Sequence, residues 1–82
     1  MVKNLVVIGC GNIGSRHLQA LTKLPFNTHV EIVDPDLNSH KIAQSRLDEV
    51  NYDKQKHEFC WYTSISELKQ KNNDLVIIAT TA

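Results

Sequence analysis

Three glycines in a short turn, followed at a distance by an aspartate, indicate the chemistry of this chain. Gly9, Gly11 and Gly14 occupy the first, third and sixth positions of the segment GCGNIG. This spacing suits a strand that stops, turns sharply and continues as a helix whose N-terminal amides face an anion. Asp34 lies 20 positions after Gly14, at the end of a second apolar run. Together these residues predict a dinucleotide site, with the pyrophosphate at the turn and the adenosine ribose at the carboxylate.

Each residue of the turn has a predicted role in that site. Gly9 permits the tight bend, Gly11 lets the pyrophosphate approach the backbone, and Gly14 lets the following helix pack closely on the sheet. The amides of Asn12 and Ile13 are expected to meet the phosphates. The competing interpretation is a glycine-rich turn between a strand and a helix that binds no ligand.

Asp34 bears on the choice between NAD and NADP. Its carboxylate is expected to accept hydrogen bonds from the ribose hydroxyls and to repel a 2′-phosphate, which favours NAD. NADP stays an alternative if His40 and Lys41 swing toward the phosphate. Asp34 could instead serve only to start the turn at Pro35.

The composition limits the chain to one domain and excludes several kinds of partner. With 82 residues, and nine Lys and Arg against nine Asp and Glu, there is no electrostatic case for nucleic acid or an anionic membrane. Apolar runs are far shorter than the roughly 18 residues of a membrane span, and no secretory signal precedes the first strand, so we expect a cytoplasmic protein. Cys10 and Cys60 are expected to be free thiols. Cys10 is either made reactive by the helix dipole or is simply a small residue beside the ligand.

Hydrophobic patterning predicts strands that alternate with helices. In the first helix the spacing predicts a buried stripe of Ile13, His17, Ala20, Leu21 and Leu24. His17 is expected to be a packed side chain within that stripe. In the second helix the spacing predicts an apolar face of Ile42, Ala43, Leu47 and Val50. Asp36 is expected to cap the second helix, and Ser64 with Glu67 to form a capping box. Trp61 and Tyr62 are assigned to the core and edge of the third strand. The strands are expected at 5–8, 29–34, 59–62 and 75–80, the helices from 13 to before Pro25, over 37–50 and over 65–71, and an exposed loop at 51–58.

This alternation predicts an α/β fold of the Rossmann type, a doubly wound parallel sheet of strand order 3-2-1-4 that stops after its fourth strand. A ligand should lie across the carboxyl ends of strands one and four, so Ala79, Thr80 and Thr81 join the candidate cofactor-binding residues. The alternative for these three is a plain strand end. His29, His40 and His57 share no metal-ligand spacing with each other or with the cysteines, so no metal site is predicted.

The glycine turn with His17 three positions on, the step Val33-Asp34-Pro35-Asp36, the segment 64–68 and the strand ending Ile77-Ile78-Ala79-Thr80 resemble a known family. They are similar to the N-terminal domain of the glucose-fructose oxidoreductase and inositol dehydrogenase (Gfo/Idh/MocA) family. That resemblance implies NAD- or NADP-dependent oxidoreduction of sugars, cyclitols or related hydroxy compounds. It also places the catalytic lysine after the fourth strand, so no catalytic residue is assigned.

We expect residues 1–82 to be the NAD(P)-binding N-terminal fragment of a larger protein, which would supply the small-molecule substrate site. We also expect self-association through the exposed fourth strand. The alternatives are a regulatory module that senses a nucleotide without catalysis and an S-adenosylmethionine site, which uses a similar turn and acidic residue.

Overall fold

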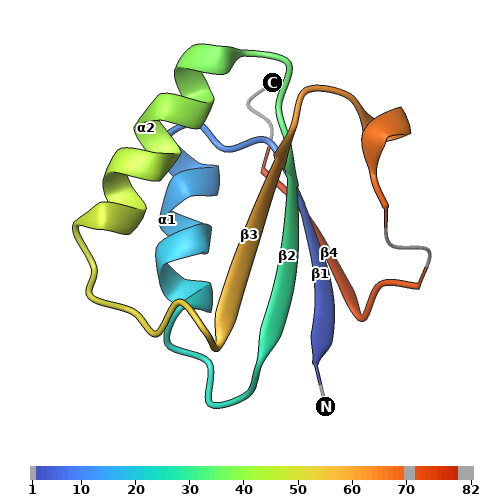
Figure 1. Ribbon diagram of the computed structural model, residues 1–82. Coiled ribbons are helices and arrows are strands. Elements are labelled where there is room, and N and C mark those ends of the chain that lie inside the picture. The colour runs from blue at the N-terminus through green and yellow to red at the C-terminus, as the bar shows by residue number, and fades with distance from the viewer. Residues whose placement is uncertain (1, 70–71, 80–82) are drawn as a thin grey trace.

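The computed structural model describes residues 2–69 and 72–79, and its strands and helices alternate along the chain (Figure 1). Its four strands form one parallel sheet in the order β3-β2-β1-β4, which confirms the predicted topology. None of its described helices is long and apolar enough to cross a membrane. The elements are β1 (Lys3–Ile8), α1 (Asn12–Leu21), β2 (Thr28–Val33), α2 (Leu37–Asp48), β3 (His57–Tyr62), the 3-10 helix η1 (Ile65–Glu67) and β4 (Leu75–Ile78).

The sheet is covered by different elements on its two faces. Figure 1 shows α1 and α2 on one side, whereas η1 lies on the other. Because side chains alternate along a strand, every second residue of β1 and β2 points toward the helices. The buried cluster on that side consists of Leu5, Val7, Cys10, Leu18, Leu21, Val30, Ile32, Ala43 and Leu47.

The residues between them on β1 and β2 are buried as well. Val6, Glu31 and Val33 on the second face are 2%, 0% and 4% exposed. The backbone amide of Lys69, in the segment that crosses this face, donates to Glu31 Oε2 at 3.1 Å. The middle parts of the two central strands are therefore enclosed on both faces, which suits the continuous apolar run of β1.

The register brings the ends of all four strands to one edge. Ile8 pairs with Val33 and with Ile78, and Val33 pairs with Tyr62. The ladder extends one residue beyond the strands, because the Gly9 amide donates to the Val33 carbonyl at 2.8 Å and the Ala79 amide to the Ile8 carbonyl at 2.8 Å. Gly9, Asp34 and Ala79, the residues that directly follow β1, β2 and β4, consequently lie at the same edge of the sheet.

The buried face of α1 differs from the predicted stripe. Ile13, His17 and Ala20 are exposed, so the assignment of His17 as a packed side chain was wrong. The smallest side chains of the first turn lie against the sheet, which rotates the larger apolar Ile13 into solvent. The residues that α1 buries are Gly14, Ser15, Leu18 and Leu21.

The predicted face and end of α2 were also partly wrong. The helix ends at Asp48 and buries His40, Ala43 and Leu47, whereas Ile42 is exposed and Val50 lies beyond the helix. His40 Nε2 lies 2.7 Å from the Asp34 carbonyl oxygen, and its ring lies 5.8 Å from that of Trp61. This polar anchor sets which face of α2 turns inward. Asp36 caps the helix as predicted, with Oδ1 accepting from the Asn38 amide at 2.9 Å.

Several other boundaries differ from the prediction. β1 begins at Lys3, β2 ends before Asp34, and β4 ends at Ile78. β3 begins at 57 rather than 59, because the side chain of His57 is buried and its Nδ1 lies 2.8 Å from Thr28 Oγ1. Of the predicted helix over 65–71, residues 65–69 form only η1, and residues 70–71 lie outside the described part of the chain. The capping box of Ser64 and Glu67 is present, but Leu68 is already extended.

Candidate functional site

A hollow of about 340 Å³ lies where β1, β2 and β4 end. It contains six of the nine cofactor-binding residues predicted from sequence, and two more that were not predicted, Asp36 and Ser39. Both lie at the start of α2, which directly follows Asp34. The sequence signal that could have found them is therefore their position just after Asp34, the residue predicted to contact the ribose. Thr80 and Thr81 lie outside the described residues. The six predicted lining residues are Gly9, Gly11, Asn12, Ile13, Asp34 and Ala79.

The structure separates the roles of the three glycines. Gly9 has a φ of 92°, in the left-handed region that other residues rarely adopt. A Cβ on Gly14 would lie 2.0 Å from the Gly9 carbonyl oxygen, so the helix can approach the strand only without a side chain there. A Cβ on Gly11 would meet nothing closer than Ser39 Oγ at 4.0 Å. The fold thus requires Gly9 and Gly14 but leaves open space at Gly11.

The N-terminus of α1 opens toward the hollow. Gly11 is its N-cap and supplies no side-chain cap, and the first turn carries no acidic residue. The first intrahelical hydrogen bond runs from the Ser15 amide to the Gly11 carbonyl oxygen at 2.8 Å. The amides before Ser15 in the first turn therefore have no acceptor within the helix. Together with the helix dipole, these amides favour an anion beside Asn12 and Ile13.

Asp34 is held at the rim of the hollow by the backbone. Its Oδ2 accepts from the Cys10 amide at 3.0 Å and its Oδ1 from the Asp36 amide at 2.9 Å. Each carboxylate oxygen has a further lone pair that can accept from a ligand hydroxyl. Asp34 therefore starts the turn at Pro35 and also presents a fixed acceptor to the hollow, so the two interpretations of this residue are compatible.

The positions of His40 and Lys41 bear on whether the site could bind the 2′-phosphate of NADP. His40 is 8% exposed, and its Nε2 is engaged by the Asp34 carbonyl oxygen at 2.7 Å. That contact and the neighbouring Trp61 ring hold His40 in a buried position, and His40 does not line the hollow. Lys41 is exposed on α2 and does not line the hollow. Of the two basic residues, His40 is therefore unsuited to a swing toward a 2′-phosphate.

Cys10 is an inert residue in the described structure. Its side chain is fully buried in the core cluster, and both cysteines are free thiols, as expected. Burial, reinforced by the negative charges of Asp34 and Asp36, raises the pKa of the Cys10 thiol to about 12. Of the two interpretations of Cys10, a small residue agrees with this structure, whereas activation by the helix dipole is contradicted because desolvation and two carboxylates oppose it.

Sequence reasoning missed an arginine that reaches the glycine turn from α2. Arg46 Nη1 donates to the Asn12 carbonyl oxygen at 3.2 Å, and Nη2 donates to Asn12 Oδ1 at 3.0 Å. Gln19 of α1 donates to the Arg46 carbonyl oxygen at 2.7 Å. These contacts fix the Asn12 side chain and add a positive charge near the start of α1. A separation of 34 residues leaves no local sequence signal for them.

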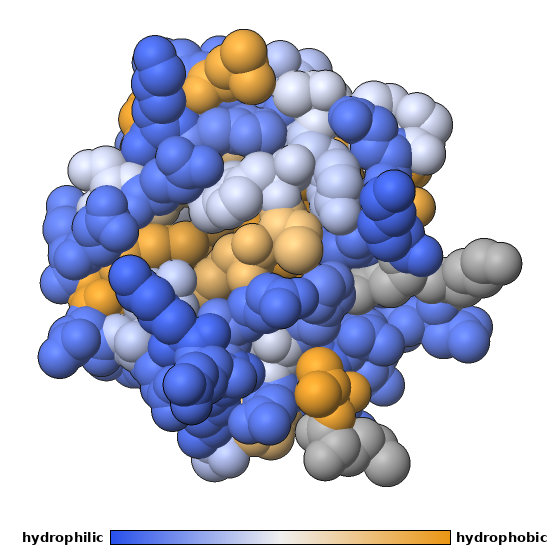
Figure 2. Space-filling model, in the orientation of Figure 1, coloured by the Kyte–Doolittle hydropathy of each residue, from blue (hydrophilic) through white to orange (hydrophobic). Residues whose placement is uncertain are grey.

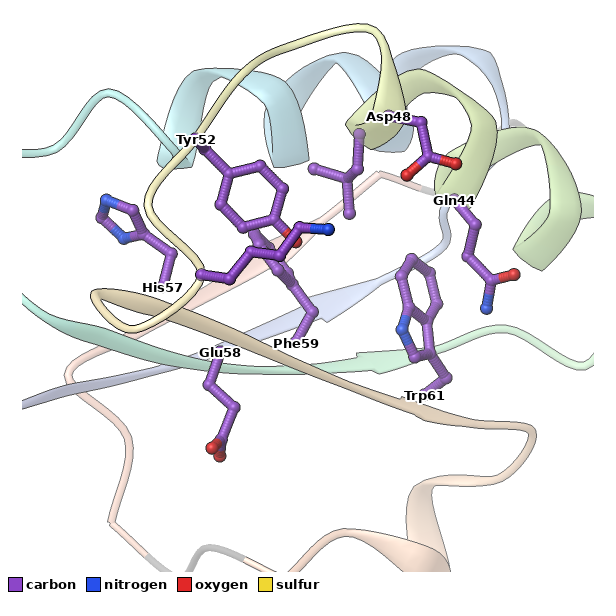
Figure 3. A pocket seen from close by; sticks show the side chains of 9 residues that line it. Gln44, Asp48, Tyr52, His57, Glu58, Phe59 and Trp61 are labelled. Carbon is purple, nitrogen blue, oxygen red and sulfur yellow. The ribbon is translucent and has the colours of Figure 1, made fainter.

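A second hollow of about 270 Å³ lies between α2 and β3 (Figure 3). Tyr52 and Phe59 meet there edge to face, with ring centroids 5.6 Å apart, and Trp61 packs against the core as predicted. Figure 3 shows the three rings along the gap, with Gln44 and Asp48 above them on α2. We interpret this second hollow as a gap in packing at the edge of the sheet.

The molecular surface seen in the orientation of Figure 1 is mostly hydrophilic, with an apolar area near its middle (Figure 2).

Comparison with known proteins agrees with the geometry of the first hollow. The model of one family, described as "Oxidoreductase family, NAD-binding Rossmann fold" (GFO_IDH_MocA), matches residues 3–82. No curated protein and no solved structure matches the chain. The family match covers nearly the whole sequence, including the turn, Asp34 and all four strands. The chain therefore belongs to the Gfo/Idh/MocA oxidoreductase family, of which it contains the NAD-binding Rossmann domain.

Proposed function

We propose that the hollow at the ends of β1, β2 and β4 binds NAD in preference to NADP, for an oxidoreductase that acts on a sugar, a cyclitol or a similar hydroxy compound. The observation that carries the proposal is the open space at Gly11, beside an uncapped helix N-terminus and a carboxylate held by two backbone amides. The bound cofactor would supply hydride transfer. The residues that line the hollow would bind and orient it.

The pyrophosphate would be held by the backbone of the turn. Gly11 allows close approach, and the amides of Asn12 and Ile13 lie at the positive end of α1. Arg46, through its contacts with Asn12, contributes a further positive charge nearby. Positive potential at this end of the hollow supports binding of an anionic group.

The preference for NAD rests on charge at the other end of the hollow. Asp34 and Asp36 both line it, and the eight lining residues include no lysine, arginine or histidine. Two amide donors hold the Asp34 carboxylate in one orientation, where it can accept from ribose hydroxyls. A 2′-phosphate would meet two carboxylates there without a compensating cation, which disfavours NADP.

Isothermal titration of the chain with NAD, NADP and S-adenosylmethionine tests the proposal. We expect NAD to bind more tightly than either competitor. Asp34→Asn removes the charge and leaves one acceptor oxygen for the two backbone amides that hold the carboxylate, so NAD should bind about tenfold or more weakly. Asp48→Asn, on the exposed far part of α2, is the matched control and should leave binding unchanged. S-adenosylmethionine binding without NAD binding at millimolar concentration would overturn the proposal.

We also propose that the chain self-associates through β4. In the described sheet β4 is an edge strand, and Leu75, Val76 and Ile78 are 50%, 48% and 71% exposed. An exposed apolar edge strand offers unpaired backbone groups to another strand. The identity of the hydroxy substrate would be set by a part of the enzyme beyond the nucleotide site.

A further inference from the structure

Three side chains with metal-binding chemistry meet on the second face of the sheet, away from the dinucleotide hollow. His29 of β2 pairs with Glu58 of β3 in the parallel ladder, and Cys60 follows Glu58 on the same face of β3. One ligand atom from each of the three lies within 4.8 Å of the other two. His29 Nδ1 and Glu58 Oε1 lie 2.5 Å apart.

We propose that His29, Glu58 and Cys60 form a binding site for a divalent transition-metal ion, for which Zn²⁺ is the best match. Zinc takes imidazole nitrogen, carboxylate oxygen and thiolate sulfur at about 2.0–2.3 Å in tetrahedral geometry. An N, O and S set favours zinc over calcium or magnesium, which prefer oxygen alone. Three protein ligands leave the fourth position for water, as in open zinc sites.

The geometry needs only small adjustments to close on an ion. Ligand atoms around tetrahedral zinc lie about 3.3–3.8 Å apart, given those bond lengths. His29 Nδ1 and Glu58 Oε1 would therefore separate by about 1 Å, and Cys60 Sγ would move in by about as much or less. The Glu58 side chain is 67% exposed and has the freedom to do this. His29, at 29% exposure, is more restrained and sets the position of the site.

The strands that carry the ligands are rigid, and their charges favour a cation. β2 is an interior strand of the sheet, and β3 is hydrogen-bonded along its full length to β2. The buried Glu31 pairs with Cys60 in the same ladder, and the carboxylates of Glu31 and Glu58 both act electrostatically on the Cys60 thiol. A bound divalent cation would compensate this negative charge. Sequence spacing did not indicate the cluster, because only the register joins His29 to residues on a strand that lies far along the chain.

Titration of the reduced, metal-free chain with Co²⁺ and Zn²⁺ tests the proposal. We expect one Co²⁺ per chain with a thiolate-to-cobalt charge-transfer band in the near ultraviolet, displaced by Zn²⁺. Cys60→Ser should abolish the band, and His29→Gln and Glu58→Gln should each weaken Zn²⁺ binding by about tenfold or more. Cys10→Ala is the matched thiol control and should retain the band, because Cys10 is buried elsewhere.

The same titration can refute the site. Absence of a charge-transfer band in the folded chain, or a band that survives Cys60→Ser, would overturn the proposal. Zn²⁺ binding that survives all three ligand substitutions would show adventitious binding at other exposed histidines and would overturn it equally. Circular dichroism of each variant establishes that it is folded. Titration of NAD in parallel keeps this result separate from the dinucleotide proposal, since the cluster lies outside that hollow.

Discussion

Gly14→Ala is the substitution that most directly tests how the strand-to-helix turn is built. The added methyl would lie 2.0 Å from the Gly9 carbonyl oxygen, 2.7 Å from the Gly9 carbonyl carbon and 3.6 Å from Ala79 Cβ. The first two atoms are backbone, so they cannot rotate away as a flexible side chain could. Either α1 must move off the sheet or the turn at Gly9, which already has a φ of 92°, must distort.

The expected cost follows from two opposing effects. Overpacking a tight contact costs about 1–3 kcal/mol, and a clash with backbone belongs at the upper end of that range. Alanine recovers up to about 1 kcal/mol of helix propensity relative to glycine. The net loss is about 2 kcal/mol of unfolding free energy. In a domain of this size, that corresponds to a fall in Tm of about 8–16 °C.

Thermal and urea unfolding followed by circular dichroism measures the loss, and Gly11→Ala is its matched control. The nearest atom to a Cβ at Gly11 would be 4.0 Å away, so the added methyl meets no close contact. We therefore expect Gly11→Ala to change stability by less than about 0.5 kcal/mol while weakening NAD, because the methyl would occupy the space for the pyrophosphate. A Gly14→Ala protein that melts within about 2 °C of the wild type would refute the close-approach argument, as would an equal loss in Gly11→Ala.

Three further predictions follow from burial and charge. Burial and the charge of Lys56 lower the pKa of His57, so the neutral ring is favoured in the folded state. Stability should therefore decline as pH falls below about 6.5. His57→Gln should reduce this decline in Tm with pH, and an unchanged slope of Tm against pH would contradict the prediction. Cys10, buried and with its pKa raised, should resist alkylation in the native chain but react in denaturant, as mass spectrometry can determine; rapid native labelling would argue against its burial. Ile78→Lys should reduce self-association in analytical ultracentrifugation, whereas a wild-type chain that is already a monodisperse monomer at high concentration would refute association through β4.

Features encoded within a few residues of each other could be predicted from the sequence. The apolar run before Gly9, the glycine spacing and the position of Asp34 identified the strand, the turn and the lining of the hollow. The capping residues Asp36 and Ser64 were found in the same way. Strand order followed from the alternation of strands and helices after a glycine turn, which is typical of the doubly wound fold with its right-handed crossovers.

Features that depend on register or on contacts between distant elements could not be predicted. Hydropathy placed Ile13 in the core, but the close approach at Gly14 turns it to solvent. His57 looks like a polar loop residue, yet pairing of β3 with β2 buries it against Thr28. The contact of Arg46 with Asn12 requires α1 and α2 to pack side by side, which no local spacing reports.

The glycine turn illustrates why a motif alone is weak evidence for a ligand. Gly9 and Gly14 would be required by this strand-to-helix turn even if nothing bound there, because one has positive φ and the other lies against the first one's carbonyl group. Gly11 is different, since a Cβ at this position would meet nothing closer than Ser39 Oγ at 4.0 Å. Evidence for a bound pyrophosphate therefore rests on Gly11 among the three glycines. If Gly11→Ala keeps its stability but no longer binds NAD, then glycine at position 11 is required for ligand binding and not for folding.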